Sequence, residues 1–342
     1  MGNDLDPITP REAVRLYLAE RETELSKKTI ENHRYRLNSW LDFCKEQDIE
    51  NMNDVTGRTL HEFRVWRQQG EGREYEPVSK VTLRGNLATM RVFLQFCDSI
   101  ETVEDGLRER IRMPVLTAEE ESRDEKLEPE AAEVALNYLD QFRYASREHA
   151  ILAILWHTGI RLGTLRALDV DDFDPSDRCL DIRHRAKEDT PLKNKAAAER
   201  SIAISDYYVE VLGDYIDHNR PKVTDKYGRQ PLFASEQGRL SHSPIRLIVY
   251  RWTQPCRWGD CPHGECPETC EYRNREAMSS CPSSKSPHAV RRGSITKHLR
   301  DGTPEEVVSD RMNSSPDVLD KHYDERSERE KMRLRRNLIK DL

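Results

Sequence analysis

The chain has 342 residues, of which 34% are charged, and its formal net charge is −7. This length favours two domains over a single core. No apolar run approaches the roughly 18 residues that a membrane span needs, and the N-terminus lacks the basic and apolar segments of a signal peptide. These features exclude a membrane-spanning protein and predict a cytoplasmic one.

The acidic balance at first argues against a nucleic-acid partner. Phosphate binding depends, however, on where basic side chains cluster and not on the net charge of the whole chain. The chain has 40 arginines and 15 lysines. Because arginine holds phosphate with a planar fork of donors, this bias suits a phosphate-binding protein.

Four helices are predicted in the first hundred residues, because apolar residues recur there at helical spacing. Ser26 precedes the second helix and is a typical N-cap residue. Four helices joined by modest loops form a small bundle, which we expect to occupy residues 1–113. The predicted helices span residues 10–22, 27–47, 59–69 and 81–99.

An acidic stretch follows the predicted bundle. Residues 114–133 hold eight acidic and two basic residues, include Pro129 and offer little to bury. Such a composition is typical of a linker. We therefore place a linker at residues 114–130 and a second domain at residues 131–342.

The second domain is predicted to begin with two helices, at residues 131–142 and 147–159. The second helix is almost entirely apolar, so we expect it to lie at the centre of a core. Gly159 is a typical C-cap residue for this helix. Arg161 then lies just beyond a buried helix, which is a rigid place for a functional group.

Strand signals come next. Residues 179–184 and 199–205 alternate apolar and polar side chains, which predicts two strands of a small antiparallel hairpin. The polar loop between them carries Lys187, Lys193 and Lys195. The hairpin is therefore expected to present a basic tip.

Five cysteines and His263 lie within residues 256–281. Their spacings of five, five, four and eleven residues do not match a standard zinc finger, but such density in a cytoplasmic protein most often indicates metal. An ordinary cysteine-rich loop is the alternative interpretation. We expect a structural zinc, with Cys266 and His263 as alternate ligands to the main set of Cys256, Cys261, Cys270 and Cys281.

The segment from Ser286 to Tyr323 reverses the charge of the chain. Residues 281–300 hold five Lys or Arg and no Asp or Glu, so an anion is expected here. His288 and Arg291 are three residues apart, which places both on one face of a helix. Tyr323 lies in a polar run where no apolar periodicity explains an aromatic side chain. The alternative interpretation is a basic helix followed by a packing tyrosine.

Taken together, these segments resemble the tyrosine recombinases, which are the phage-integrase and Xer-like site-specific recombinases. HTGIRLGTLRALDVDDFD is similar to the first arginine box and places Arg161 at the first catalytic arginine. LKNKAAAERSIAIS resembles the hairpin with the family's lysine, which is Lys193, with Lys195 and Lys187 as weaker candidates. HAVRRG matches the His-x-x-Arg box, and KHYDE supplies the tyrosine. The last two boxes give His288, Arg291 and Tyr323.

The resemblance implies a mainly α fold with a small antiparallel β-sheet. Residues 1–113 correspond to a SAM-like core-binding domain that contacts DNA. Residues 131–342 correspond to the α+β catalytic domain, here with a cysteine-rich insert at 256–281 and a C-terminal tail at 328–342. The insert is not general in the family.

The resemblance also implies the chemistry. Tyr323 attacks a DNA phosphodiester and leaves a 3′-phosphotyrosyl link and a free 5′-hydroxyl, without a required cofactor or divalent metal. Arg161 and Arg291 neutralise the transition state, Lys193 protonates the leaving oxygen, and His288 assists proton transfer or orients the phosphate.

Two positions depart from the family pattern. Ser314 stands nine residues before Tyr323, where most relatives have histidine or tryptophan, and Thr164 replaces an acidic residue. The implied partner is double-stranded DNA, bound by a homotetramer of a protein that is a monomer or dimer when free. The implied function is site-specific DNA recombination or integration. A catalytically weakened DNA-binding protein and a type IB topoisomerase-like enzyme are the alternatives.

Overall fold

The computed structural model describes residues 5–70, 77–117, 120, 125–324 and 326–338. The chain divides into two compact units, Met1–Asp124 and Glu125–Leu342. The division falls inside residues 114–130, where the sequence predicts a linker. Residues 118–119 and 121–124 of that linker and residues 339–342 of the tail lie outside the described part. Among the described residues, no helix is both long and apolar enough to cross a membrane.

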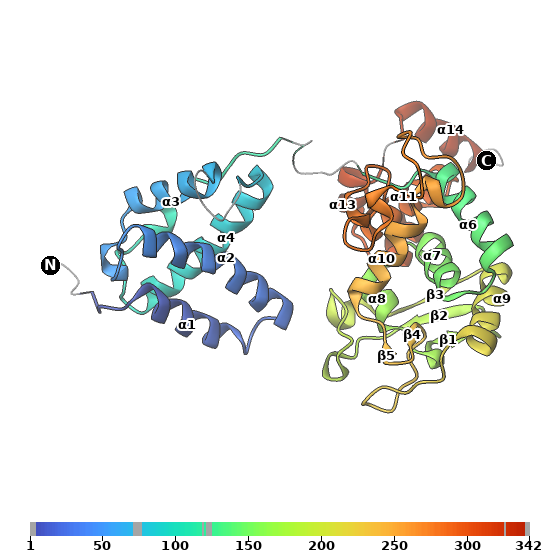
Figure 1. Ribbon diagram of the computed structural model, residues 1–342, viewed down its shortest axis with the longest axis horizontal. Helices are drawn as coiled ribbons and strands as arrows, with labels where there is room; N and C mark the ends of the chain where they lie inside the picture. Colours follow the sequence, from blue (N-terminus) through green and yellow to red (C-terminus); the bar gives the residue numbers. More distant parts are fainter. Residues whose placement is uncertain (1–4, 71–76, 118–119, 121–124, 325, 339–342) are drawn as a thin grey trace. The chain divides into compact units, whose positions relative to one another are not determined.

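In the described residues up to Met113, unit 1 is a bundle of four α-helices (Figure 1). The first, second and fourth helices begin at side-chain caps on Thr9, Ser26 and Ser79, and Thr56 forms a capping box at the third, which satisfies otherwise unpaired N–H groups. The helices are α1 (Pro10–Arg21), α2 (Lys27–Glu46), α3 (Gly57–Gln69) and α4 (Lys80–Ser99). The predicted bundle is therefore present, with helix ends within two residues of those expected.

The core of unit 1 is built on aromatic rings. Trp40 packs edge-on against Phe63 at a centroid distance of 5.3 Å, and Phe43 packs edge-on against Phe63 at 5.4 Å. All three side chains are at most 2% exposed. Edge-to-face pairs of this kind add to the stabilisation that area burial provides.

Unit 2 is built around α7 (Arg147–Thr158), as the apolar sequence of that helix predicts. Nine of its twelve residues are buried. It packs against α6 (Pro129–Arg143), α9 (Asp206–Asp214), α10 (His242–Trp252) and α11 (Pro287–Arg300). Figure 1 shows these helices gathered around α7, with the small sheet on one side.

The sheet of unit 2 has three antiparallel strands in the order β1-β2-β3. The strands are β1 (Phe173–Asp174), β2 (Cys179–Ile182) and β3 (Arg200–Ala203). Leu180 pairs with Ile202 at the centre of the β2–β3 register, and both side chains face the core. The predicted hairpin is thus β2–β3, and β4 (Ala234–Ser235) pairs with β5 (Gly238–Arg239) in a separate two-stranded sheet.

The remaining helices of unit 2 are α8 (Leu162–Ala167), α12 (Glu305–Met312), α13 (Pro316–His322) and α14 (Glu328–Leu338). A second apolar cluster joins α11, α12 and α13 and includes Ile295, Met312 and Leu319. This cluster fixes the C-terminal helices against α11. The fold is therefore mainly helical with a small antiparallel sheet, as expected.

Gly293 lies where α11 meets the backbone that leads into α6. A Cβ atom at this position would stand 2.0 Å from the carbonyl oxygen of Leu127, so only glycine fits without movement of the main chain.

We expect Gly293→Ala to lower the free energy of unfolding by about 2 kcal/mol or more. Gly213 in α9 is the matched control, because no atom lies within 4 Å of the Cβ it lacks. Gly213→Ala should not destabilise, since alanine favours helix. Urea unfolding compares the variants, and equal stability of Gly293→Ala and the parent would contradict this packing.

Candidate active site

A pocket of 590 Å³ lies in unit 2, and segments distant in the sequence line it. All five side chains that the sequence predicts to be catalytic are among its lining residues. These are Arg161, Lys193, His288, Arg291 and Tyr323. The pocket therefore brings together two guanidiniums, an amine, an imidazole and a phenol.

Arg161 is positioned by the end of α7. That helix ends at Gly159, whose φ of 60° is left-handed and whose N–H donates to the carbonyl oxygen of Leu155. The chain then turns into α8, with Arg161 as its first flanking residue. The Nη1 atom of Arg161 donates to the carbonyl oxygen of Asn313 at 2.9 Å. One side of this guanidinium is thus held by the backbone while the residue lines the pocket.

Arg291 is held more tightly. Its Nη1 atom donates to the carbonyl oxygens of Gly159 at 2.6 Å and of Met312 at 2.8 Å. Burial, together with the nearby charge of Arg161, lowers the pKa of Arg291 to about 10, although the Tyr323 oxygen opposes that shift. Arg291 therefore remains charged at neutral pH, and two like charges are held side by side where an anion would relieve their repulsion.

His288 lies in the first turn of α11, where the Ser286 side chain caps the helix by accepting the N–H of Ala289 at 3.2 Å. Its ring lies 6.4 Å from the ring of Tyr323, centroid to centroid. Burial lowers the pKa of His288, and the charge of Arg291 lowers it further. The imidazole is therefore neutral at pH 7 and has one nitrogen free to accept a proton.

Tyr323 follows α13 and is only 7% exposed. Its side chain belongs to the apolar cluster of α11, α12 and α13. The carbonyl oxygen of Tyr323 accepts a hydrogen bond from Thr296 Oγ1 at 3.2 Å. The phenol thus lines the pocket of its own chain, with its ring fixed by packing.

Lys193 lies in the loop between β2 and β3. Among the described residues, it is the candidate lysine that lines the pocket, and neither Lys187 nor Lys195 does. The neighbouring Asn194 donates from Nδ2 to Oδ1 of Asn313 at 2.7 Å. Asn313 has a left-handed φ of 50°, which asparagine tolerates better than most residues. Asn313 therefore links the lysine loop to Arg161, whose guanidinium its carbonyl oxygen also binds.

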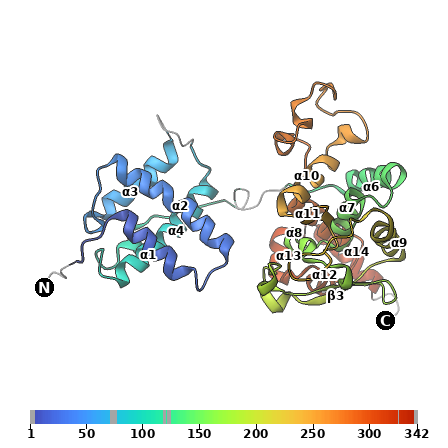
Figure 2. The ribbon, with the colours of Figure 1, turned by 60° about the horizontal axis from the view of Figure 1, so that its bottom comes forward.

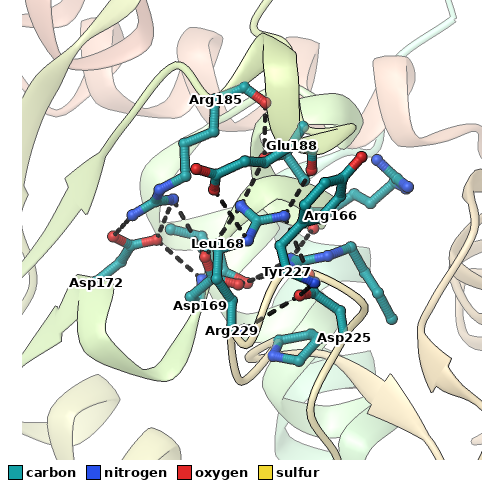
Figure 3. A network of polar contacts seen from close by, with 12 residues as sticks. Arg166, Leu168, Asp169, Asp172, Arg185, Glu188, Asp225, Tyr227 and Arg229 are labelled. Carbon is teal, nitrogen blue, oxygen red and sulfur yellow. Dashed lines mark hydrogen bonds and ion pairs between the residues drawn. The ribbon is translucent and has the colours of Figure 1, made fainter.

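A buried charge network holds the base of that loop (Figure 3). The carboxylate of Asp172, 1% exposed, accepts two hydrogen bonds from Arg185, at 2.9 and 2.5 Å. Arg229 pairs with Asp169 at 3.3 Å and donates to the carbonyl oxygen of Glu188 at 2.6 Å. Because Arg185 and Glu188 belong to the segment between β2 and Lys193, the network fixes the start of the loop to the body of unit 2.

Loss of a buried partner in this network should be costly. Asp172→Ala leaves the guanidinium of Arg185 largely buried without its two-point acceptor, so we expect the free energy of unfolding to fall by about 3 kcal/mol. The control is Lys226→Ala, because the pair of Lys226 and Asp189 lies at the exposed rim and should contribute about 1 kcal/mol at most. Thermal unfolding of both variants tests this. Equal losses would mean that burial does not govern the network.

The two departures from the family pattern also lie at the pocket. Thr164 and Ser314 both line it and are 8% and 7% exposed. Within the described chain, the Ser314 hydroxyl has no hydrogen-bond partner, whereas its backbone N–H and carbonyl both bond to Ser309. A buried hydroxyl without a partner at this wall can donate to an anion in the pocket.

Three further lining residues were not expected from the sequence. His242, Arg246 and Tyr250 are spaced four residues apart on α10 and line the pocket. The spacing of Ile245, Ile248 and other apolar residues in this segment is a helical signal that could have revealed α10. The periodicity gives no indication, however, of which cavity its polar face meets.

The predicted zinc site is not supported. In Figure 2 the insert extends outward beyond α10. Residues 256–281 all belong to the described chain, and in that chain no group of three or more His, Cys, Asp or Glu side chains could hold a metal. Instead, His263 Nε2 bonds Ser283 Oγ at 2.9 Å and Cys266 Sγ donates to Glu268 at 2.9 Å. As they stand, these side chains do not fit a four-ligand site built from Cys256, Cys261, Cys270 and Cys281.

Comparison with known proteins places the chain in a family. Residues 16–99 match the phage integrase N-terminal SAM-like domain, and residues 125–262 match the phage integrase family. The second match includes Arg161 and Lys193 and ends before the His-x-x-Arg segment. A two-domain integrase is therefore the class that the fold and the pocket define, and the chain belongs to the phage integrase family of tyrosine recombinases.

Curated relatives agree with this assignment. Tyrosine recombinase XerC of Shewanella amazonensis is 25% identical over 245 residues, which cover 70% of this chain and 72% of the relative. Tyrosine recombinase XerC of Natranaerobius thermophilus is 25% identical over 240 residues, which cover 68% and 74%. These matches extend over most of both chains.

Solved structures share the fold. The Tn1549 transposon integrase in complex with transposon right end DNA has a TM-score of 0.64 at 15% identity and covers 97% of this chain and all of that one. A lambda integrase dimer bound to a COC′ core site has a TM-score of 0.60 at 11% identity, over 98% of this chain and 80% of that one.

Proposed function

We propose that this protein is a site-specific DNA recombinase that cuts and rejoins double-stranded DNA through a 3′-phosphotyrosyl intermediate. The observation that carries the proposal is the convergence of Arg161, Lys193, His288, Arg291 and Tyr323 on one pocket. Membership of the tyrosine recombinases supports it. The DNA named in the descriptions of the Tn1549 and lambda integrase structures supports the choice of partner.

The covalent step begins at Tyr323. Its phenol oxygen forms a bond to the phosphorus as the bond from phosphorus to the 5′-oxygen breaks. The phenol proton leaves to a base, for which neutral His288 stands beside the ring, and the 5′-oxygen takes a proton from Lys193. The phosphodiester energy is kept in the new ester, so a 5′-hydroxyl from another strand can reverse the step without ATP.

The transition state gathers negative charge on the non-bridging oxygens. Arg161 and Arg291 are held by backbone carbonyls before substrate arrives, so little reorganisation is needed to neutralise that charge. The Ser314 hydroxyl is positioned to donate to the same phosphate in place of the histidine or tryptophan of relatives. His288 then carries the larger share of proton transfer.

Because Tyr323 lines the pocket of its own chain, we propose that each protomer cleaves in cis. Recombination joins two duplexes and therefore requires several protomers. We propose a homotetramer on DNA, in line with the lambda integrase tetramer bound to a Holliday junction, which has a TM-score of 0.60 at 11% identity. The enzyme would act in the cytoplasm, the compartment that we expect to hold its DNA.

The sequence also predicts a structural zinc in the cysteine-rich insert. Cys256 is close enough to Cys261 and Cys281 to interact with them electrostatically. The described side chains nevertheless form no group that could hold a metal ion. No step of the proposed reaction uses a metal. Elemental analysis of protein purified without chelator decides the matter: about one zinc per chain would restore the prediction, and none would exclude it.

A duplex with a nick close to the cleavage position tests the proposed function. Cleavage releases a short fragment from such a duplex, so the reverse reaction is lost and the covalent complex accumulates. We expect a complex that survives denaturing electrophoresis and carries the DNA by its 3′ end. Tight binding without any covalent complex would favour the weakened DNA-binding protein, and relaxation of any supercoiled plasmid by the monomer would favour a topoisomerase.

A further inference from the structure

The helix α10 presents a polar stripe to the candidate active site. Its opposite face is fixed in the core of unit 2 by Ile245, Val249 and Trp252. The stripe consists of His242, Arg246 and Tyr250, spaced four residues apart, and all three line the same pocket as Tyr323. The stripe is therefore held at the pocket by a rigid, well-packed element.

The described residues that line this pocket include no Asp or Glu. Its cations are Arg161, Lys193, Arg246 and Arg291. This is unusual in a chain with 62 acidic residues. An acid-free wall with four cations attracts more than one negative charge, because each cation left without a counter-ion repels the others.

Arg246 differs from the two arginines that we assign to the cleaved phosphate. Arg161 and Arg291 each donate to backbone carbonyls. Arg246 is exposed, and its guanidinium has no hydrogen bond or ion pair with any residue of the described chain. Its fork of donors is therefore available in full for a ligand.

The size of the pocket fits a stretch of strand better than a single phosphate. The volume of the pocket is 590 Å³. Successive phosphates of one DNA strand are only about 3.4 Å apart along the helix axis, so the phosphates on either side of the cleaved one lie close to it. A strand that delivers one phosphate to Arg161 and Arg291 brings its neighbouring phosphates to the same pocket, which α10 also lines.

We infer that Arg246 binds the backbone phosphate next to the one that is cleaved, with Tyr250 and His242 as neighbouring polar contacts. This inference rests on the proposed function. Phosphate contacts carry no sequence information but fix the register of the strand. Arg246 thus sets which phosphorus faces the Tyr323 hydroxyl, and it acts as a positioning residue for the reaction.

The test combines one variant with one change in the DNA. A methylphosphonate removes the charge of a single phosphate, and it is placed in turn on each side of the cleaved position in the nicked duplex. For the parent protein, one of these two neutral positions should slow covalent complex formation about tenfold. On ordinary DNA, Arg246→Ala should form the covalent complex more slowly than the parent by a similar factor. The methylphosphonate at that same position should not slow Arg246→Ala any further.

Arg251→Ala is the matched control, because Arg251 is an exposed arginine of the same helix that does not line the pocket. It should respond to both methylphosphonates as the parent does. The inference is overturned if Arg246→Ala is as sensitive as the parent to both neutral positions, or if it is not slowed on ordinary DNA.

The same comparison separates this inference from the proposed function. If the parent forms no covalent complex on ordinary DNA, the proposed function fails first. The affinities of the parent and Arg246→Ala for the same duplexes then test the phosphate contact by itself. Loss of the contact should also reduce the slope of log affinity against log salt by about one, and an unchanged slope would overturn it.

Discussion

Tyr323→Phe should abolish the covalent complex while DNA binding persists. The substitution removes only the oxygen that attacks the phosphorus. The ring remains in the apolar cluster with Leu299, Val308 and Leu319, so we expect no loss of fold. On the nicked duplex we expect no detectable covalent product. The affinity for DNA should stay within about twofold of that of the parent, because a single hydroxyl contributes little to binding that depends on many phosphate contacts.

Tyr227→Phe is the control for this experiment. Tyr227 is an exposed tyrosine of unit 2 that contacts Lys226 and Arg229 through its ring, and it does not line the pocket. This variant should form the covalent complex at the parental rate. A Tyr323→Phe protein that still became linked to DNA would show that another side chain is the nucleophile.

Lys193→Ala should slow cleavage by about 10²- to 10⁴-fold, which is the usual contribution of a general acid. The defect should disappear on a duplex whose leaving 5′-oxygen is replaced by sulfur. A thiolate leaves without a proton because thiols are far more acidic than alcohols. The rate of covalent complex formation on the two duplexes is the measurement, and Arg161→Ala should stay slow on both because it stabilises charge on other oxygens.

The other two loop lysines provide matched controls. Lys187→Ala and Lys195→Ala remove the same charge from the same loop, but neither residue lines the pocket. Both should retain rates close to that of the parent on the oxygen duplex. The general acid would be a different lysine if the sulfur duplex restored the cleavage rate of Lys187→Ala or Lys195→Ala and did not change that of Lys193→Ala.

Periodicity predicted the elements that hold the site. The apolar run of α7 reflects burial on all sides, and the alternation in β2 and β3 reflects burial on one face. The sequence therefore predicted that Arg161 follows α7 and that the lysine loop joins β2 to β3. The resemblance favoured Lys193 over Lys187 and Lys195, and of these three lysines Lys193 is the one in the described lining of the pocket. What periodicity cannot show is how the loop is held, because the hydrogen bond from Asn194 to Asn313 joins segments more than a hundred residues apart.

The charged residues were the least predictable part. The sequence analysis made no prediction for Asp169 and Asp172, and the structure shows that both are buried and paired with arginines from later segments. Such pairing leaves no local pattern, because each partner lies in a different loop. The cysteine-rich insert shows the opposite case, since a dense local pattern indicated a metal site that the side-chain positions do not form.

The most direct test of the whole account is to identify the residue that becomes attached to DNA. The complex trapped on a nicked duplex is digested with protease and nuclease, and the modified peptide is sequenced by mass spectrometry. We expect a 3′-linked nucleotide on Tyr323, within the peptide that joins α13 to α14. Attachment at any other residue, or through a 5′ phosphate, would contradict it.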